Sequence, residues 1–174
     1  SRLKGLSSSE YQMQEQTIGP LSRFSLGFGT GLLMNRPGQD QVWKRDVMVN
    51  LCGFYQVNQN IDFVMELGGL INRKVIDVQT GLDYVFGLEK GKIGLGGDVG
   101  LEFYGSGKYN TSDNAVSPLL SARIAFTADI SDRFHIQLYV PYKAVFNRNT
   151  IHRIGIGLRF LFSGRFKDVQ LIKA

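Results

Sequence analysis

The chain has 174 residues, which is enough for one domain with a substantial core and too few for two. Its 21 glycines, 4 prolines and 11% aromatic residues favour strands and turns over a helical bundle. The net charge of +5 is compatible with nucleic-acid binding, but no basic helix stripe or RNA-binding motif accompanies it. We therefore expect no nucleic-acid partner.

No run of about 18 apolar residues is present, so the sequence excludes a membrane-spanning helix. A β-barrel is the other structure that can cross a bilayer, because lipid offers no partners for unpaired backbone groups. The chain begins at Ser1 without a basic and apolar leader, which fits a cytosolic protein or a mature form that has lost its signal peptide. We prefer the second interpretation. The single cysteine, Cys52, cannot form an intramolecular disulfide, and its role stays open.

Residues 1–21 lack alternation and are rich in Ser, Gln and Glu, so we interpret them as a periplasmic arm. From residue 22 to residue 162 the side chains alternate with a period of two, which is typical of strands. The alternation occurs eight times, and its apolar rows cover residues 24–32, 47–55, 61–71, 78–86, 93–103, 120–130, 134–142 and 154–162. Residues 163–174 form a shorter periplasmic tail. The predicted fold is all-β, an eight-stranded antiparallel up-and-down transmembrane barrel.

The row complementary to the apolar one mixes glycines with charges of both signs in the middle of strands. In a soluble, lipocalin-like barrel, the alternative fold, the apolar row would face inward and the polar row would be an ordinary wet surface. The glycines instead suit a crowded lumen, and strands of about 10 to 13 residues can cross a bilayer at a tilt. We predict a paired lumen network, with a continuous ion path as the alternative, formed by Asp62, Glu66, Asp98, Glu102, Arg123, Asp129 and Arg159.

The connections indicate the orientation of the barrel. Tight turns at residues 58–60, 89–91 and 131–132 alternate with longer or more basic connections at 35–45, 72–74, 105–117 and 147–151. Outer-membrane barrels place short turns in the periplasm and longer loops outside, so both termini are expected in the periplasm. The outer connections could pair with lipopolysaccharide phosphates, or be ordinary solvated charges, through Arg36, Lys44, Arg45, Arg73, Lys74, Lys108 and Arg148.

The last strand carries a local motif, because Arg153, Gly155, Leu158 and Phe160 follow the pattern polar-x-Gly-x-x-apolar-x-apolar. This pattern resembles the signal that the barrel assembly machinery recognises. Over residues 22–162 the architecture resembles the small outer-membrane barrel superfamily that includes the OmpA transmembrane domain, OmpX and OmpW. The resemblance implies an outer-membrane location, contact with lipid and lipopolysaccharide, and insertion by that machinery. The polar tail after Phe162 departs from the proteobacterial pattern and is more similar to barrel proteins of Bacteroidota.

No enzyme site is visible in the sequence. His135 is followed two residues later by Gln137, so the His-x-Ser arrangement of small lipid A deacylase barrels is missing. There is no metal-ligand cluster, P-loop or dinucleotide-binding motif, and we expect no metal and no cofactor. The sequence therefore predicts a non-enzymatic structural or accessory subunit of a larger outer-membrane complex. The alternatives are a stand-alone small channel or ligand-binding barrel like OmpW and, third, a lipid A-modifying enzyme.

Overall fold

The computed structural model describes residues 24–36, 43–105, 115–147 and 150–164. Within these ranges the chain forms eight strands and one short 3-10 helix, η1 (Ile71–Arg73). The strands are β1 (Phe24–Arg36), β2 (Lys44–Asn58), β3 (Ile61–Leu70), β4 (Val75–Leu88), β5 (Gly91–Tyr104), β6 (Val116–Asp129), β7 (Phe134–Val145) and β8 (Ile151–Ser163).

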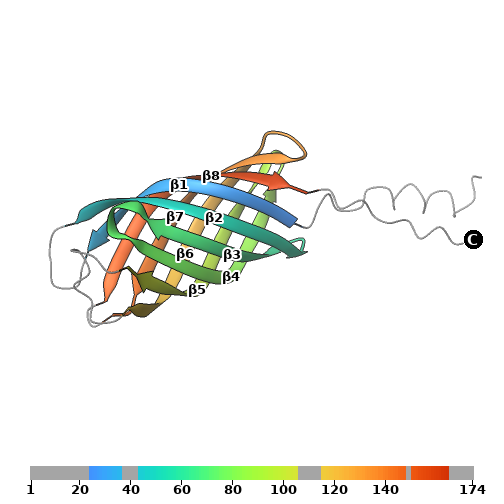
Figure 1. Cartoon of the computed structure of the whole chain (residues 1–174). Coiled ribbons are helices and arrows are strands. Elements are labelled where there is room, and N and C mark those ends of the chain that lie inside the picture. Colours follow the sequence, from blue (N-terminus) through green and yellow to red (C-terminus); the bar gives the residue numbers. More distant parts are fainter. Residues whose placement is uncertain (1–23, 37–42, 106–114, 148–149, 165–174) are drawn as a thin grey trace, which may run out of the picture.

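The strands form a closed barrel in which each pairs with its neighbour along the chain and β1 pairs with β8 (Figure 1). All pairs are antiparallel, and Leu26 of β1 lies opposite Phe162 of β8 at the closing seam. The predicted fold class, an eight-stranded antiparallel up-and-down barrel, is confirmed. Because closure pairs every edge strand, no strand edge of the barrel is left without a partner.

The barrel has two distinct ends. At one, which we call the turn end, β1 begins and β8 finishes, and Ser25 lies opposite Ser163. The tight connections after β2, β4 and β6 lie at the same end (Figure 1). The opposite end, the loop end, carries the connections after β1, β3, β5 and β7.

Local sequence explains two of the connections. Gly91 has a φ of +155°, and a Cβ there would lie 2.1 Å from the Thr127 carbonyl oxygen, so the turn between β4 and β5 needs glycine. At the loop end, η1 is closed by Lys74 in the left-handed conformation, with a φ of 51°. The strand expected to extend to Ile71 therefore ends at Leu70, because the chain turns into η1 at once.

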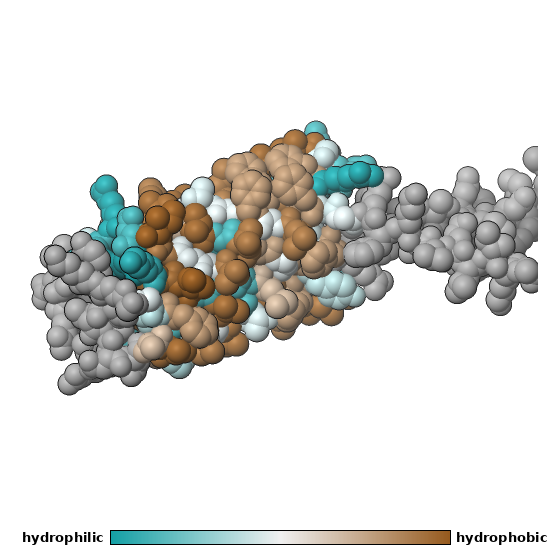
Figure 2. All heavy atoms as spheres, viewed as in Figure 1, coloured by the Kyte–Doolittle hydropathy of each residue, from teal (hydrophilic) through white to brown (hydrophobic). Residues whose placement is uncertain are grey.

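The wall is apolar outside and polar inside. On β6, Leu120, Ile124 and Phe126 are 50%, 60% and 47% exposed, whereas Arg123 between them is only 4% exposed. Figure 2 shows hydrophobic side chains over the middle of the wall and hydrophilic ones near both ends. This orientation is the reverse of a lipocalin-like barrel, whose apolar row would face inward.

Candidate functional site in the barrel interior

The centre of the lumen is organised around one carboxylate, Glu66 on β3. Its Oε2 accepts a hydrogen bond from Arg159 of β8 and lies 3.7 Å from Nη1 of Arg123 on β6. Its Oε1 lies 3.5 Å from Nζ of Lys143 on β7. Glu66 is only 5% exposed, so three cations from three strands compensate a charge that water cannot reach easily.

Arg123 connects this centre to two further carboxylates, on β4 and on β5, the strand next to its own. Its Nη2 donates to Asp83 at 2.6 Å, and its Nη1 donates to Asp98 at 3.1 Å. Space for this arrangement depends on Gly96, because a Cβ there would lie 1.9 Å from Asp83 Oδ1. The small residue beside the charge cluster therefore has a steric role, which is the role expected for glycines of the inward row.

A second part of the network lies toward the loop end. Arg153 holds Glu102 through both terminal nitrogens, with 2.7 Å between Nη2 and Oε1. Its Nε donates to Asn35 Oδ1 at 2.5 Å, and the amide of Asn35 donates to Asp46. Arg73 of η1 completes the series, with its Nε 2.6 Å from Asp46 Oδ2. Polar contacts thus reach from the loop end deep into the lumen.

Apolar clusters also occupy part of the inward row, a feature that the sequence analysis did not anticipate. Toward the turn end, a buried cluster comprises Cys52, Phe54, Val64 and Leu161. A second cluster comprises Leu33, Met48, Leu70, Val75, Ala125 and Tyr139. The guanidinium of Arg159 lies 3.8 Å from the Tyr139 ring centroid, within cation–π range. Side chains of both kinds therefore fill the centre of the described lumen.

The structure brings together most of the residues expected in the lumen network. Contacts with buried partners are made by Glu66, Asp98, Glu102, Arg123 and Arg159. Asp62 pairs instead with Lys92, at 2.5 Å, nearer the turn end. Asp129 lies apart from the network at the end of β6, where its side chain is 48% exposed and bonds to His135.

The basic residues expected at the outer face are distributed unevenly. Four are exposed at the loop end: Arg36, Lys44, Arg45 and Lys74. Arg73 is turned toward Asp46 of the lumen network. Lys108 and Arg148 lie outside the described residues, as do the expected arm, residues 1–21, and the tail after residue 164.

The proposed assembly signal alternates across the wall of β8. Arg153 faces the lumen, whereas Leu158 faces outward. Phe160 is on the outward row and stacks on Phe134 of β7, with ring centroids 6.3 Å apart. Gly155 is on the inward row, where a Cβ would lie 2.5 Å from Leu33 Cδ2.

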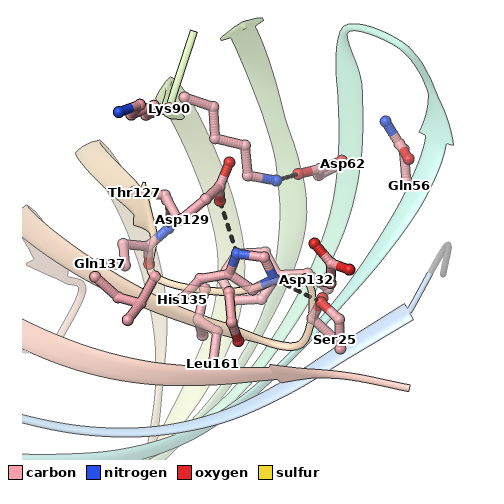
Figure 3. Close-up of a pocket in the computed structure, with 15 residues that line it drawn as sticks. Ser25, Gln56, Asp62, Lys90, Thr127, Asp129, Asp132, His135, Gln137 and Leu161 are labelled. Atoms are coloured by element: carbon pink, nitrogen blue, oxygen red, sulfur yellow. Dashed lines mark hydrogen bonds and ion pairs between the residues drawn. The ribbon is translucent and has the colours of Figure 1, made fainter. Parts of the chain in front are cut away.

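A cavity of about 650 Å³ lies at the turn end. Within it, His135 Nδ1 lies 2.7 Å from Asp129 Oδ1, and His135 Nε2 lies 3.0 Å from Ser163 Oγ. A fourth side chain extends the series, since Ser25 Oγ lies 2.8 Å from Ser163 Oγ. Figure 3 shows His135 projecting into the cavity beside Asp129, with Asp62 on another part of the wall. A carboxylate, an imidazole and a hydroxyl group thus contact one another in that order.

Sequence reasoning missed this cluster because its members come from different strands. A His-x-Ser motif places both residues on one strand, whereas Asp129, His135 and Ser163 lie on β6, β7 and β8. The available signal was that the turn after β6 is tight, which places Asp129 opposite His135. The partner from β8 requires the register of the β7–β8 pair, which alternation alone does not fix.

No group of three or more His, Cys, Asp or Glu side chains in the described ranges of the chain could hold a metal ion. No helix in the same ranges is long and apolar enough to cross a membrane.

The fold is similar to two solved small barrels. Neisserial surface protein A matches with a TM-score of 0.63 at 13% identity, over 79% of this chain and 96% of that one. The N-terminal β-barrel domain of Pseudomonas aeruginosa OprF matches with a TM-score of 0.53 at 11% identity, over 79% of this chain and 97% of that one. No protein-family model and no curated protein matches the sequence. The similarity establishes the fold of small eight-stranded outer-membrane barrels, as the sequence predicted.

Proposed function

We propose that this protein is an integral barrel of the bacterial outer membrane with a closed, non-conducting lumen, serving as an accessory subunit of a larger envelope complex. The apolar outer wall supports the location, because a contiguous belt of exposed Leu, Ile, Val and Phe side chains would be unfavourable in water. The alternation of apolar outside and polar inside is the pattern of transmembrane barrels.

Dense ion pairing inside the barrel is the observation that supports a non-conducting lumen. Arg123, Glu66 and Arg159 bridge the centre between opposite walls, and the apolar clusters fill the space on either side. Eight strands leave an interior that side chains can fill completely. An ion would have to displace a buried, paired charge in order to pass. A closed barrel is therefore favoured over a conducting channel.

Planar-bilayer recording with the purified full chain tests the closed lumen. We expect no unitary conductance above the lipid baseline, and the same result for the variant Leu120→Ala, which changes only the outer wall. Steady single-channel steps, altered by Glu66→Gln, would contradict the proposal and favour the small-channel alternative.

A groove on the outer wall supports the accessory role. It measures about 790 Å³ and is lined mainly by apolar side chains of β1 to β4 around Gly53. A Cβ at Gly53 would have its nearest neighbours 3.8 Å away, so the space above this residue is free of close contacts. An apolar side chain from the membrane-embedded wall of a larger barrel would fill the depression and gain dispersion contacts.

Gentle detergent extraction followed by size-exclusion chromatography and mass spectrometry tests this role. We expect stoichiometric co-elution with one larger outer-membrane protein, reduced by Gly53→Leu, which fills the groove. The matched control is Gly97→Leu, on the outward row of β5 and outside the groove. A monomer, or a complex that Gly53→Leu leaves intact, would contradict the proposed docking.

The orientation completes the proposal. With the turn end in the periplasm, as in known outer-membrane barrels, the start of β1 and the end of β8 both face that compartment. The exposed basic residues of the loop end, Arg36, Lys44, Arg45 and Lys74, would then lie at the level of lipopolysaccharide phosphates. The β8 motif would serve insertion by the barrel assembly machinery. Protease or biotin labelling of tagged termini in intact cells distinguishes the two orientations.

A further inference from the structure

We propose that Ser163, His135 and Asp129 form a serine-hydrolase site at the turn end, and that its substrate is a small carboxylic ester. The inference goes beyond the proposed function and revises the expectation of a barrel without catalytic activity. It depends on neither the partner nor the closed lumen, so it can fail while those proposals stand.

The hydrogen bonds assign a role to each polar atom. An ionised Asp129 carboxylate can only accept, so the proton of the neutral imidazole lies on His135 Nδ1, 2.7 Å away. His135 Nε2 is then an acceptor, and Ser163 Oγ, at 3.0 Å, donates to it. Ser25 can in turn donate to Ser163 Oγ across 2.8 Å. These are the contacts that a nucleophilic serine, its general base and the orienting carboxylate require.

Strand pairing in the barrel positions these groups. Asp129 lies directly opposite His135 in the β6–β7 pair, and Ser25 lies directly opposite Ser163 in the β1–β8 pair. The ladder is continued by the backbone N–H of Ser163, which donates to the Arg133 carbonyl at 2.9 Å. His135 is 18% exposed at its side chain, so it is mostly shielded while still lining the cavity.

The cavity indicates the class of substrate. Its floor is apolar, because Phe54 and Leu161 are buried there at 5% and 4% exposure. Its rim is polar and carries Lys90, Lys92 and Asp132. An ester with a short apolar acyl group toward the floor and a polar alcohol toward the rim suits this division. A volume of about 650 Å³ admits such a molecule.

The reaction balances without a further reagent except water. Ser163 Oγ attacks the carbonyl carbon, its proton passes to His135 Nε2, and the carbonyl oxygen becomes an oxyanion. The bond from carbon to the alcohol oxygen then breaks, and the leaving alcohol takes the proton from His135. Water, deprotonated by His135, attacks the acyl-serine, releases the carboxylic acid and restores Ser163. Asp129 is a positioning residue, since it holds the imidazole and stabilises its charged form.

Ser25 is the candidate oxyanion donor. Its hydroxyl is adjacent to the attacking oxygen, at 2.8 Å, so it can turn to the developing negative charge once Ser163 is bonded to carbon.

The decisive test is labelling of the full chain, folded in detergent micelles, with a fluorophosphonate probe, followed by peptide mapping. We expect one adduct on Ser163, and hydrolysis of p-nitrophenyl butyrate that is abolished by Ser163→Ala. His135→Gln should lower kcat by roughly 100-fold or more. Asp129→Asn should lower kcat with little change in KM, because Asp129 does not touch substrate. Ser25→Ala should keep the adduct but lower kcat.

The control is Ser121→Ala, a lumen serine outside the cavity, which should leave labelling and hydrolysis unchanged. Folding of each variant is checked by the gel mobility of unheated samples. An unlabelled folded chain, an adduct on another residue, or hydrolysis that persists in Ser163→Ala would overturn the proposal.

Discussion

Arg123→Met should destabilise the barrel strongly, because it removes the base at the centre of a buried ionic cluster. Arg123 faces Asp83 at 2.6 Å, Asp98 at 3.1 Å and Glu66 at 3.7 Å, and is 4% exposed. In the variant, Glu66 would still be paired with Arg159 and Lys143. Asp83 and Asp98 would lose Arg123, which is their partner in the ion pairs of the described residues. Breaking a buried pair by removing one partner costs about 3 to 5 kcal/mol.

Urea unfolding of the barrel in lipid vesicles measures this cost through tryptophan fluorescence, since the chain has one tryptophan, Trp43. The triple variant Arg123→Met, Asp83→Asn, Asp98→Asn should recover part of the loss, because it removes the uncompensated charges together with the base. A loss below about 1 kcal/mol for Arg123→Met, or no recovery in the triple variant, would refute the reasoning that these charges are buried and mutually paired.

Three further outcomes follow from packing. Gly157→Ala places a Cβ 2.4 Å from Tyr139 Cζ and should cost about 1 to 3 kcal/mol in the same unfolding assay, whereas Gly97→Ala, whose nearest atom would be 3.9 Å away, should cost little. Equal effects of the two alanines would contradict this steric argument. Ile124→Arg, on the outward row, should cost about 2 to 4 kcal/mol in vesicles, and a neutral result would argue against lipid contact. Cys52, 3% exposed, should react with a thiol reagent only after unfolding, and rapid reaction in the folded barrel would contradict its burial.

The fold could be predicted because alternation is a direct consequence of strand geometry. Every second residue faces the same side, so the exposed Leu120, Ile124 and Phe126 and the buried Arg123 could be assigned to opposite faces from their spacing. The tight turns set antiparallel neighbours, and a closed barrel is the arrangement in which such strands keep no free edge. These arguments need only local sequence.

The contacts inside the lumen could not be predicted to the same extent. Which base meets Glu66 depends on the stagger between β3, β6, β7 and β8, and that stagger is a property of closure rather than of any one strand. Alternation also does not distinguish the middle of a strand from its end, so the pattern alone assigns Asp129 to the buried charges although its side chain is 48% exposed. Predicting the cluster of Asp129, His135 and Ser163 would require both the stagger between strands and the position of each residue along its strand.

The most direct test of the membrane-spanning, inside-out barrel is collisional accessibility of spin labels along β6. Single cysteines would replace Leu120, Ala122, Ile124 and Phe126 in a Cys52→Ser background, with the protein reconstituted in vesicles. All four residues are on the exposed outward row. Collisions with oxygen should dominate over those with a water-soluble nickel complex, most strongly in the middle of the row. Dominant nickel accessibility along the whole row would mean that this face contacts water, and would contradict the account.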